Sequence, residues 1–300
     1  MTLTIAYMTC RRNPRFEWFA DSIREQLDPA QFDLLVVDFY AKERDLAEYA
    51  RSIGINAKSM TPKPTVWQGA HRLVKENHFA AANARNTAIC AAKGDYLVFA
   101  DDLSVARPGW GQAVLEAARA GYVVCGSYEK MLEMQVVKGH LVSAKQHQPG
   151  KDARLLHQAH VGPCHPGWFY GCSCGAPLEA FLKINGYPEI ADGMGYEDAV
   201  TGMALAENGY KFVFDPRMAT VESEEGHHED KPFIRSDPGV SPNDKSHALL
   251  NICHKTKRFD NYFGPDGIRG LREKIQAGEP FPVIQIPEHE WFTGKPLREL

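Results

Sequence analysis

The sequence lacks any apolar run long enough to cross a membrane. Among its 300 residues, no stretch approaches the ~20 consecutive apolar residues that a transmembrane helix needs. The pattern of an amino-terminal signal peptide is also missing, because the apolar run at residues 3–8 is short and Arg11 and Arg12 follow it rather than precede it. We therefore expect a cytoplasmic protein.

The sequence also lacks a strong net charge and the even number of cysteines that is typical of a disulfide framework. The formal net charge is only -4, which gives no sign of a broad basic face for nucleic acid. The seven cysteines are an odd number, which favours reduced thiols over a disulfide framework. With no internal repeat and 44% hydrophobic residues, the chain is long enough for one large α/β domain, alone or with an extension.

Strand-like and helix-like segments alternate along the first half of the chain. Apolar runs at 3–8 and 34–37 predict buried strands, and apolar residues at helical spacing predict helices at 16–27 and 43–53. This alternation predicts an α/β fold with a doubly wound, mostly parallel sheet. We further expect strands at 96–99, 122–125, 170–174, 212–214 and 218–221, a hairpin over 127–143, irregular segments at 61–78 and 145–166, and helices at 87–92, 108–120, 177–184, 197–208 and 244–255.

The stretch from Asn83 to Asp102 carries the strongest chemical signal. It opens with a polar cluster that includes Arg85, continues as a short alanine-rich helix and a buried strand, and ends in Asp101 and Asp102. Paired acids at the end of a buried strand are costly unless they are neutralised, and Mg²⁺ or Mn²⁺ suits their oxygen ligands. Ligands also bind at such strand ends in α/β sheets. The alternative is that the two acids end the strand in a solvated turn or cap the next helix.

Two further stretches combine acids with turn or metal-binding residues. Residues 185–198 contain three glycines and end in Glu197 and Asp198, which open a helix. Acids in a first helical turn also suit the helix dipole, which is the purely structural explanation. Residues 222–230 hold five acids together with His227 and His228.

Together these motifs resemble the nucleotide-sugar glycosyltransferases of the GT-A fold, especially the inverting family two. Residues 83–102 are similar to the ARN…DxD block of that family, residues 186–189 to its GGFDE turn, and residues 195–198 to its GxED loop. The resemblance covers residues 3–230 and implies a GT-A-like catalytic domain at 1–230, with a nucleotide-binding half at 1–102 and an acceptor half at 103–230. Residues 231–300 are then a C-terminal extension with one helix.

The resemblance implies a role for each matched residue. Asp198 would be the general base, with Glu197 beside it, and Mn²⁺ or Mg²⁺ would be held by Asp101 and Asp102. His227 or His228 would complete the metal site. The implied donor-binding residues are Thr9, Arg11, Asp38, Asn83, Arg85 and Asp101.

The implied reaction is metal-dependent transfer of a sugar from a nucleotide-diphosphate sugar, with a UDP-sugar favoured, to an acceptor hydroxyl with inversion. The acceptor would be a saccharide or small molecule. One alternative is a modified base in DNA, bound with help from basic residues of the tail (Lys255, Lys257, Arg258, Arg269 and Arg272). Two others are a nucleotidyltransferase and an inactive nucleotide-sugar-binding protein, the latter because Leu103 stands where DxD has its second acid.

The middle of the chain leaves two more interpretations open. A zinc site is one interpretation of Cys164, His165, Cys172 and Cys174, although their spacing is not that of a standard zinc knuckle. Thiols of the core or of an acceptor cleft are the favoured alternative. The aromatic residues at 168–170 would either line a sugar-binding cleft or pack in the core.

Overall fold

The computed structural model describes residues 2–64, 80–189, 196–228, 257–259, 261 and 263–282. The chain forms two compact units that interleave along the sequence. Unit 1 consists of residues 1–61, 92–178 and 211–231, and unit 2 of residues 62–91, 179–210 and 232–300. The predicted division into a catalytic domain with two halves and an extension beyond residue 230 stays a prediction.

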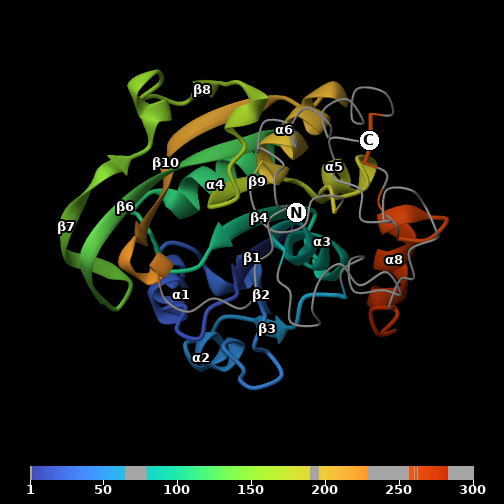
Figure 1. Cartoon of the computed structure of the whole chain (residues 1–300), viewed down its shortest axis with the longest axis horizontal. Helices are drawn as coiled ribbons and strands as arrows, with labels where there is room; N and C mark the ends of the chain where they lie inside the picture. Colours follow the sequence, from blue (N-terminus) through green and yellow to red (C-terminus); the bar gives the residue numbers. More distant parts are fainter. Residues whose placement is uncertain are drawn as a thin grey trace. The chain divides into compact units, whose positions relative to one another are not determined.

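Unit 1 is built on a ten-stranded sheet with the order β3-β2-β1-β4-β9-β6-β10-β5, in which β7 pairs with β6 and β8 with β10 (Figure 1). The strands are β1 (Leu3–Thr9), β2 (Phe32–Asp38), β3 (Ala57–Met60), β4 (Tyr96–Asp101), β5 (Ser104–Ala106), β6 (Val123–Val137), β7 (His140–Lys151), β8 (Gly162–Pro163), β9 (Ser173–Pro177) and β10 (Phe212–Ser223).

The first four strands of this order pair in parallel, as do β6 and β10. Ile5 of β1 lies between Leu34 of β2 and Val98 of β4 in register, and β2 pairs in parallel with β3. The three residues are almost fully buried, as expected for continuous apolar strands of a parallel sheet. β9 pairs antiparallel with both β4 and β6. The fold is therefore the predicted α/β fold with a mostly parallel sheet, although antiparallel strands extend it.

Three helices of unit 1 pack on one face of the sheet. They are α1 (Phe16–Arg24), α2 (Ala47–Ser52) and α4 (Trp110–Ala120), and their apolar residues share one core cluster with alternate residues of β1, β2 and β4. Phe19 and Trp110 meet edge to face at 5.7 Å between ring centroids. Gly121 ends α4 with φ 70°, a conformation in which glycine carries no Cβ penalty.

The hairpin in unit 1 is longer than its sequence pattern predicts. The expected turn is present at Lys138 and Gly139, with φ 48° and 76°, but β7 continues to Lys151, so the prediction of an irregular segment from 145 was wrong at its start.

β10 is one strand, not two. Its pairing with β6 shifts in register between Asp215 and Ala219. There the Asp215 carboxylate accepts the backbone N–H of Arg217 at 2.9 Å. The strand therefore continues through a bulge at the position where the sequence predicted a break between two strands.

Unit 2 is helical in its described part. It contains α3 (Ala81–Ala91), α5 (Leu178–Lys183) from Glu179 on, α6 (Glu197–Glu207) and α8 (Gly267–Gln276). α3 begins before the polar cluster, so Asn83 and Arg85 lie inside the helix, which corrects the prediction of a helix from Thr87. The expected helix at 244–255 lies outside the described residues, whereas α8 was not predicted. No helix in the described part of the chain has the length and hydropathy of a membrane span.

The C-terminal tail is bound to the rest of unit 2 through α8. Arg272 Nη1 donates to the carbonyl oxygens of Ile89 and Cys90, both at 3.1 Å, and Gln276 Nε2 donates to Cys90 O at 2.9 Å. Carbonyls in the last turn of a helix have no partner within the helix. α8 therefore caps the C-terminal end of α3.

Asn261 attaches a second part of the tail to the turn at 185–189. Its side-chain amide donates to the carbonyl oxygens of Asn185 and Tyr187 at 2.7 and 2.8 Å, and its Oδ1 accepts the backbone N–H of Glu189 at 2.9 Å. The side chain is buried. One residue of the tail thus satisfies three backbone groups of a turn that lies more than 70 positions earlier in the sequence.

We predict that Asn261→Ala lowers the free energy of unfolding by about 2–4 kcal/mol. The buried backbone groups of Asn185 and Glu189 lose the Asn261 side chain as a partner, and the Tyr187 carbonyl oxygen keeps only Asn86 Nδ2 as a donor. The measurement is urea unfolding followed by circular dichroism. Asn56→Ala is the matched control, since Asn56 is exposed and its loss should change stability by less than about 0.5 kcal/mol. Equal, small effects of both substitutions would show that the tail does not support this turn.

Candidate active site

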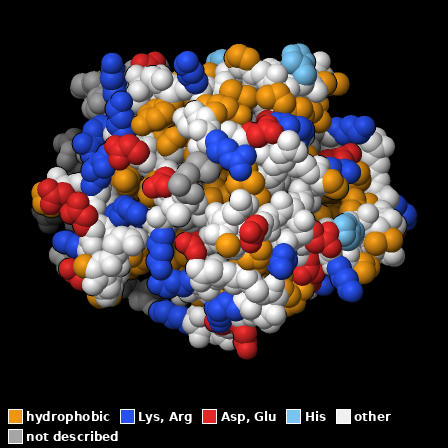
Figure 2. Space-filling view, turned by 180° about the vertical axis from the view of Figure 1, so that it is seen from behind, with side chains coloured by type: hydrophobic (Ala, Val, Ile, Leu, Met, Phe, Trp, Pro, Cys, Tyr) orange, Lys and Arg blue, Asp and Glu red, His pale blue; other side chains and the backbone are white. Residues whose placement is uncertain are grey.

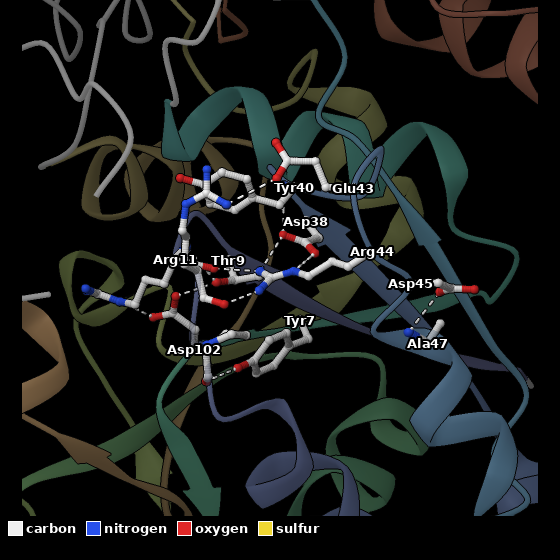
Figure 3. A network of polar contacts seen from close by, with 12 residues as sticks. Tyr7, Thr9, Arg11, Asp38, Tyr40, Glu43, Arg44, Asp45, Ala47 and Asp102 are labelled. Atoms are coloured by element: carbon white, nitrogen blue, oxygen red, sulfur yellow. Dashed lines mark hydrogen bonds and ion pairs between the residues drawn. The ribbon is translucent and has the colours of Figure 1, made fainter. Parts of the chain in front are cut away.

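The carboxyl ends of β1, β2 and β4 bring the predicted donor-binding residues of unit 1 together (Figure 3). Thr9 pairs in register with Asp38, and Met8 pairs with Asp101. Because parallel strands end at the same edge of a sheet, side chains far apart in the sequence meet there. Tyr7 OH donates to Pro14 O at 2.8 Å and so holds the loop that follows β1.

Asp102 is neutralised by a side chain of the chain itself. Its Oδ2 accepts the Thr9 hydroxyl at 2.7 Å, and its Oδ1 accepts Arg11 Nε at 3.1 Å. Arg11 also donates through Nη1 to Gly226 O at 2.6 Å. Both charged side chains of the pair are buried. The sequence led us to expect a cation as the partner of this acid, and the structure places an arginine there.

Asp38 is fully buried and bound by Arg44. Arg44 Nε donates to Asp38 Oδ2 at 2.7 Å, and Nη2 donates to Oδ1 at 3.0 Å. Oδ1 also accepts the backbone N–H of Tyr40 at 2.9 Å. The same guanidinium donates to the carbonyl oxygens of Arg11, at 2.6 Å, and Arg12. Arg44 therefore joins the loop after β1 to the loop after β2, a role that no periodicity in the sequence indicates.

Asp101 has a second acid near it that the sequence analysis did not single out. Glu222 is buried towards the end of β10, where its register partner on β5 is Ser104. Burial, followed by the charge of Asp101, raises the pKa of Glu222 to about 8. Leu103, at the motif position where an acid was expected, has φ 60° and is buried. Glu222 thus contributes a carboxyl near Asp101 that the motif lacks at Leu103.

The metal site expected at this edge is only partly described. No group of three or more His, Cys, Asp or Glu residues within the described chain has an arrangement that could hold a metal ion. His227 and His228 belong to the short helix η5 (Glu225–His228), but their side chains lie outside the described part. Their predicted role as ligands therefore stays a prediction.

In unit 2, Arg85 and Glu197 form a buried ion pair. Arg85 Nη1 lies 2.7 Å from Glu197 Oε1, both side chains are less than a tenth exposed, and the guanidinium lies over the Tyr187 ring at 5.3 Å. The pair ties the middle of α3 to the first residue of α6. The expected donor contact of Arg85 stays a prediction, and its observed partner is the acid beside Asp198.

A second buried ion pair fixes the turn before α6. Lys63 Nζ lies 2.8 Å from Glu189 Oε2, with each side chain 2% exposed. Asn86 Nδ2 donates to Glu189 Oε1 at 2.8 Å, and its Oδ1 accepts the N–H of Tyr187 at 2.7 Å. Asn83 Nδ2 donates to Lys63 O at 2.7 Å. Asn83 and Asn86 therefore hold the backbone in place, which is a positioning role.

Asp198 differs from its neighbour in exposure. It is the second residue of α6 and is half-buried, whereas Glu197 is 5% exposed. Its Oδ1 accepts the backbone N–H of Ala199 at 2.7 Å. Tyr196 precedes the helix with φ 67° and is exposed. Of the two acids, Asp198 is the one with accessible surface.

The alternative sites in the middle of the chain have structural explanations. Phe169 is fully buried and packs against Phe212, so it is a core residue. Arg154 lies over the Tyr170 ring at 4.1 Å, in a buried ion pair with Asp152. The described cysteines are not in disulfide bonds. The zinc interpretation of Cys164, His165, Cys172 and Cys174 finds no metal-binding group in the described part.

Two of the five basic residues of the tail have structural partners in the described part. Arg269 pairs with Glu179 and Arg272 caps α3, while Lys255 lies outside the described residues. On the face shown in Figure 2, Lys and Arg side chains are interspersed with Asp and Glu side chains. The acceptor in modified DNA stays an alternative without structural support.

Similar proteins were found in sequence and in structure. The chain is 29% identical over 123 residues to the ESX-3 secretion-associated protein EspG3 of Mycolicibacterium smegmatis. The aligned residues make up 41% of this chain and 36% of that protein. The chain thus spans about a third of the length of this relative, and the match assigns no function.

The similar solved structures share the fold at low identity. TarS residues 1–349 of S. aureus in complex with UDP has a TM-score of 0.56 and 13% identity, covering 84% of this chain and 65% of that one. GalNAc-T7 with UDP, GalNAc and Mn²⁺ has a TM-score of 0.59 and 14% identity, covering 94% of this chain and 59% of that one.

These neighbours establish the GT-A fold that the sequence motifs predict. The model of the family described as "Glycosyl transferase family 2" matches residues 19–169, which is half of the chain and includes β2, β4 and the acids at the end of each. The chain belongs to glycosyl transferase family 2.

Proposed function

We propose that this protein transfers a sugar from a UDP-sugar to an acceptor hydroxyl, with inversion and with the help of a divalent cation. The observation that carries the proposal is the gathering of Thr9, Asp38, Asp101 and Asp102 at one sheet edge in a member of this family. The solved neighbours that hold UDP, one of them also with Mn²⁺, support the choice of nucleotide and metal. The acceptor is proposed to be a saccharide or small molecule.

The donor side of the reaction falls to unit 1. Asp101 and Asp102 would hold Mn²⁺ or Mg²⁺, because carboxylate oxygens suit these cations. Burial, and after it the charges of Asp101 and Asp102, raise the pKa of Glu222 to about 8, so a third carboxyl group lies near the two acids. When bound, such a cation offsets the charge that develops on the departing diphosphate. Arg11 offsets part of the charge of Asp102.

The acceptor side of the reaction falls to unit 2. An acceptor hydroxyl must lose its proton as it attacks the sugar, and a positioned carboxylate takes that proton. We assign this role to Asp198, because it has accessible surface whereas Glu197 is held by Arg85. Glu197 is then a positioning residue: its ion pair with Arg85 fixes the start of the helix that carries the base.

Replacing Asp198 with Asn should lower kcat by roughly 10²–10⁴-fold, because the proton acceptor is lost, and should leave the dissociation constant of UDP unchanged. Turnover is measured as UDP release in the presence of acceptor, and affinity by calorimetry. Glu207→Gln, at the exposed far end of the same helix, is the control and should retain full activity. A loss of UDP binding in proportion to the loss of activity would refute the assignment of a base.

Replacing Asp101 with Asn should weaken UDP binding roughly tenfold or more in manganese and leave the weaker binding in chelator unchanged, because only the metal contact is lost. The measurement is calorimetric titration of UDP under both conditions. Asp28→Asn, at the exposed turn before β2, is the control. An unchanged response to manganese would exclude metal ligation by Asp101.

Glu222 should also give the metal-free protein a distinctive pH dependence. In the unfolded chain its carboxyl titrates near 4.5, whereas in the folded protein its pKa is about 8. Between these values the unfolded state releases the proton and the folded state keeps it. The contribution of Glu222 to stability is therefore full at low pH and falls by up to about 1.4 kcal/mol per pH unit as pH rises through this window.

The test is urea unfolding of the wild type and Glu222→Gln in chelator, from about pH 5 to about pH 9. The variant cannot ionise, so the wild type should lose stability relative to it as pH rises to about 8. Parallel curves for the two proteins would contradict the raised pKa.

A further inference from the structure

The loop between β7 and β8, residues 152–161, is held in place at both ends. At its start Arg154 forms a buried ion pair with Asp152, with 2.6 Å between Nη2 and Oδ2, and donates to a carbonyl oxygen of β6 at 2.7 Å. At its end Gln158 Nε2 donates to Gly162 O at 3.0 Å, and β8 pairs with β10. This β7–β8 loop is therefore an anchored part of unit 1, and the side chains that it exposes start from a fixed backbone.

The β7–β8 loop exposes several apolar side chains. Leu156 is 87% exposed, the highest value of any large hydrophobic residue in the described part of the chain, and Val161 is 44% exposed. Ala153 and Ala159 are exposed as well. At the edge of the molecule where Figure 1 shows β8, Figure 2 shows hydrophobic and His side chains together. Single exposed apolar residues need no explanation, whereas several in one anchored loop mark an interaction surface.

The charged side chains around this surface are cationic. Residues 153–178 contain no Asp or Glu, although the chain has 38 of them in 300 residues. His157 and His160 of the loop are exposed, and so is Lys151 directly before it. Lys211, also exposed, directly precedes β10, the strand with which β8 pairs. The apolar residues are thus surrounded by side chains that complement an anionic partner.

The acids that adjoin the start of the loop already have cationic partners. Asp152 is paired with Arg154. Glu129, the register partner of Lys151 on β6, is paired with Arg107. These two carboxylates therefore do not cancel the positive charge that Lys151 presents beside the loop.

We propose that the β7–β8 loop docks on an anionic lipid bilayer. Leu156 and Val161 enter the boundary between headgroups and acyl chains, and Lys151 and Lys211 contact the headgroups. Buried apolar area together with attraction to anionic lipids is how peripheral proteins bind a membrane surface. The inference goes beyond the proposed function, because lipid binding requires neither the nucleotide sugar nor the acceptor.

A lipid surface fits the loop better than a protein partner does. The cores of protein interfaces are enriched in aromatic residues, Met and Arg. The β7–β8 loop contains no aromatic residue and no Met, and its one arginine, Arg154, is buried. Its exposed apolar side chains are aliphatic, which suits the non-directional contact with acyl chains.

The test is flotation of the full chain with vesicles of phosphatidylcholine alone or of phosphatidylcholine mixed with phosphatidylglycerol. The wild type should partition into the anionic vesicles roughly tenfold or more better than into the neutral ones, because two lysines meet the charged headgroups. Leu156→Ser should weaken partition into the anionic vesicles by roughly tenfold, because its side chain no longer gains from burial. Val142→Ser, which removes a 64% exposed apolar residue from β7, is the matched control and should float as the wild type does.

Four outcomes would overturn the inference. The folded wild type could fail to float with either kind of vesicle, or it could partition equally into both, which would remove the anionic surface. Equal effects of Leu156→Ser and Val142→Ser would place the lipid contact outside the loop. A dimer seen by light scattering without vesicles, and lost in Leu156→Ser, would identify a second copy of the chain as the occupant. UDP binding is measured separately without lipid, so this inference and the proposed function can fail independently.

Discussion

The donor-side cluster depends on how unit 1 accommodates carboxylates at the ends of buried strands. Removing such a charge from water costs several kcal/mol unless a partner is supplied. Asp102 forms an ion pair with Arg11, and Asp38 forms one with Arg44. At Glu222, burial and the nearby acids raise the pKa to about 8. Each ion pair also joins two loops, so the charges that a ligand would meet are fixed in position before it binds, which is how preorganised sites work.

Unit 2 also pairs its buried charged side chains with one another. The pairs Arg85–Glu197 and Lys63–Glu189 are buried, and each joins segments more than a hundred residues apart. The tail completes this arrangement through Asn261 and α8. Residues beyond 231, which match no family motif, thereby become part of the framework that holds α3 and the turn before α6. A chain cut before these residues would lose partners for several buried backbone groups.

Much of the fold could be predicted from the sequence, because buried parallel strands and their helices have a clear apolar periodicity. β1, β2, β4, α1, α4 and α6 lie where the pattern predicts them, within a few residues. The predicted start of α3 was wrong because Asn83 and Asn86 have low helix propensity. In the folded protein their side chains donate to Lys63 O and to Glu189 Oε1 from inside the helix. α8 was missed because its charged residues hide a narrow apolar face, formed by Ile268 and Leu271.

The candidate site was predictable as a set of acids but not as a network. Strand ends and motif spacing identify Asp38, Asp101 and Asp102. Arg44 and Glu222 belong to no motif, and their contacts with these acids are known only once the positions of β2 and β10 in the sheet are known. The expectation that a cation alone would balance Asp102 failed for the same reason: Arg11 lies 91 residues earlier in the sequence. Pairing between distant residues depends on topology, which local patterns do not encode.

We propose that the acids at the sheet edge bind a nucleoside diphosphate through a divalent cation. The most direct measurement is calorimetric titration of UDP into the wild-type protein, with manganese and then with chelator. We expect saturable one-site binding in manganese that weakens strongly in chelator. Absence of binding under both conditions, by a protein shown to be folded by circular dichroism, would contradict it.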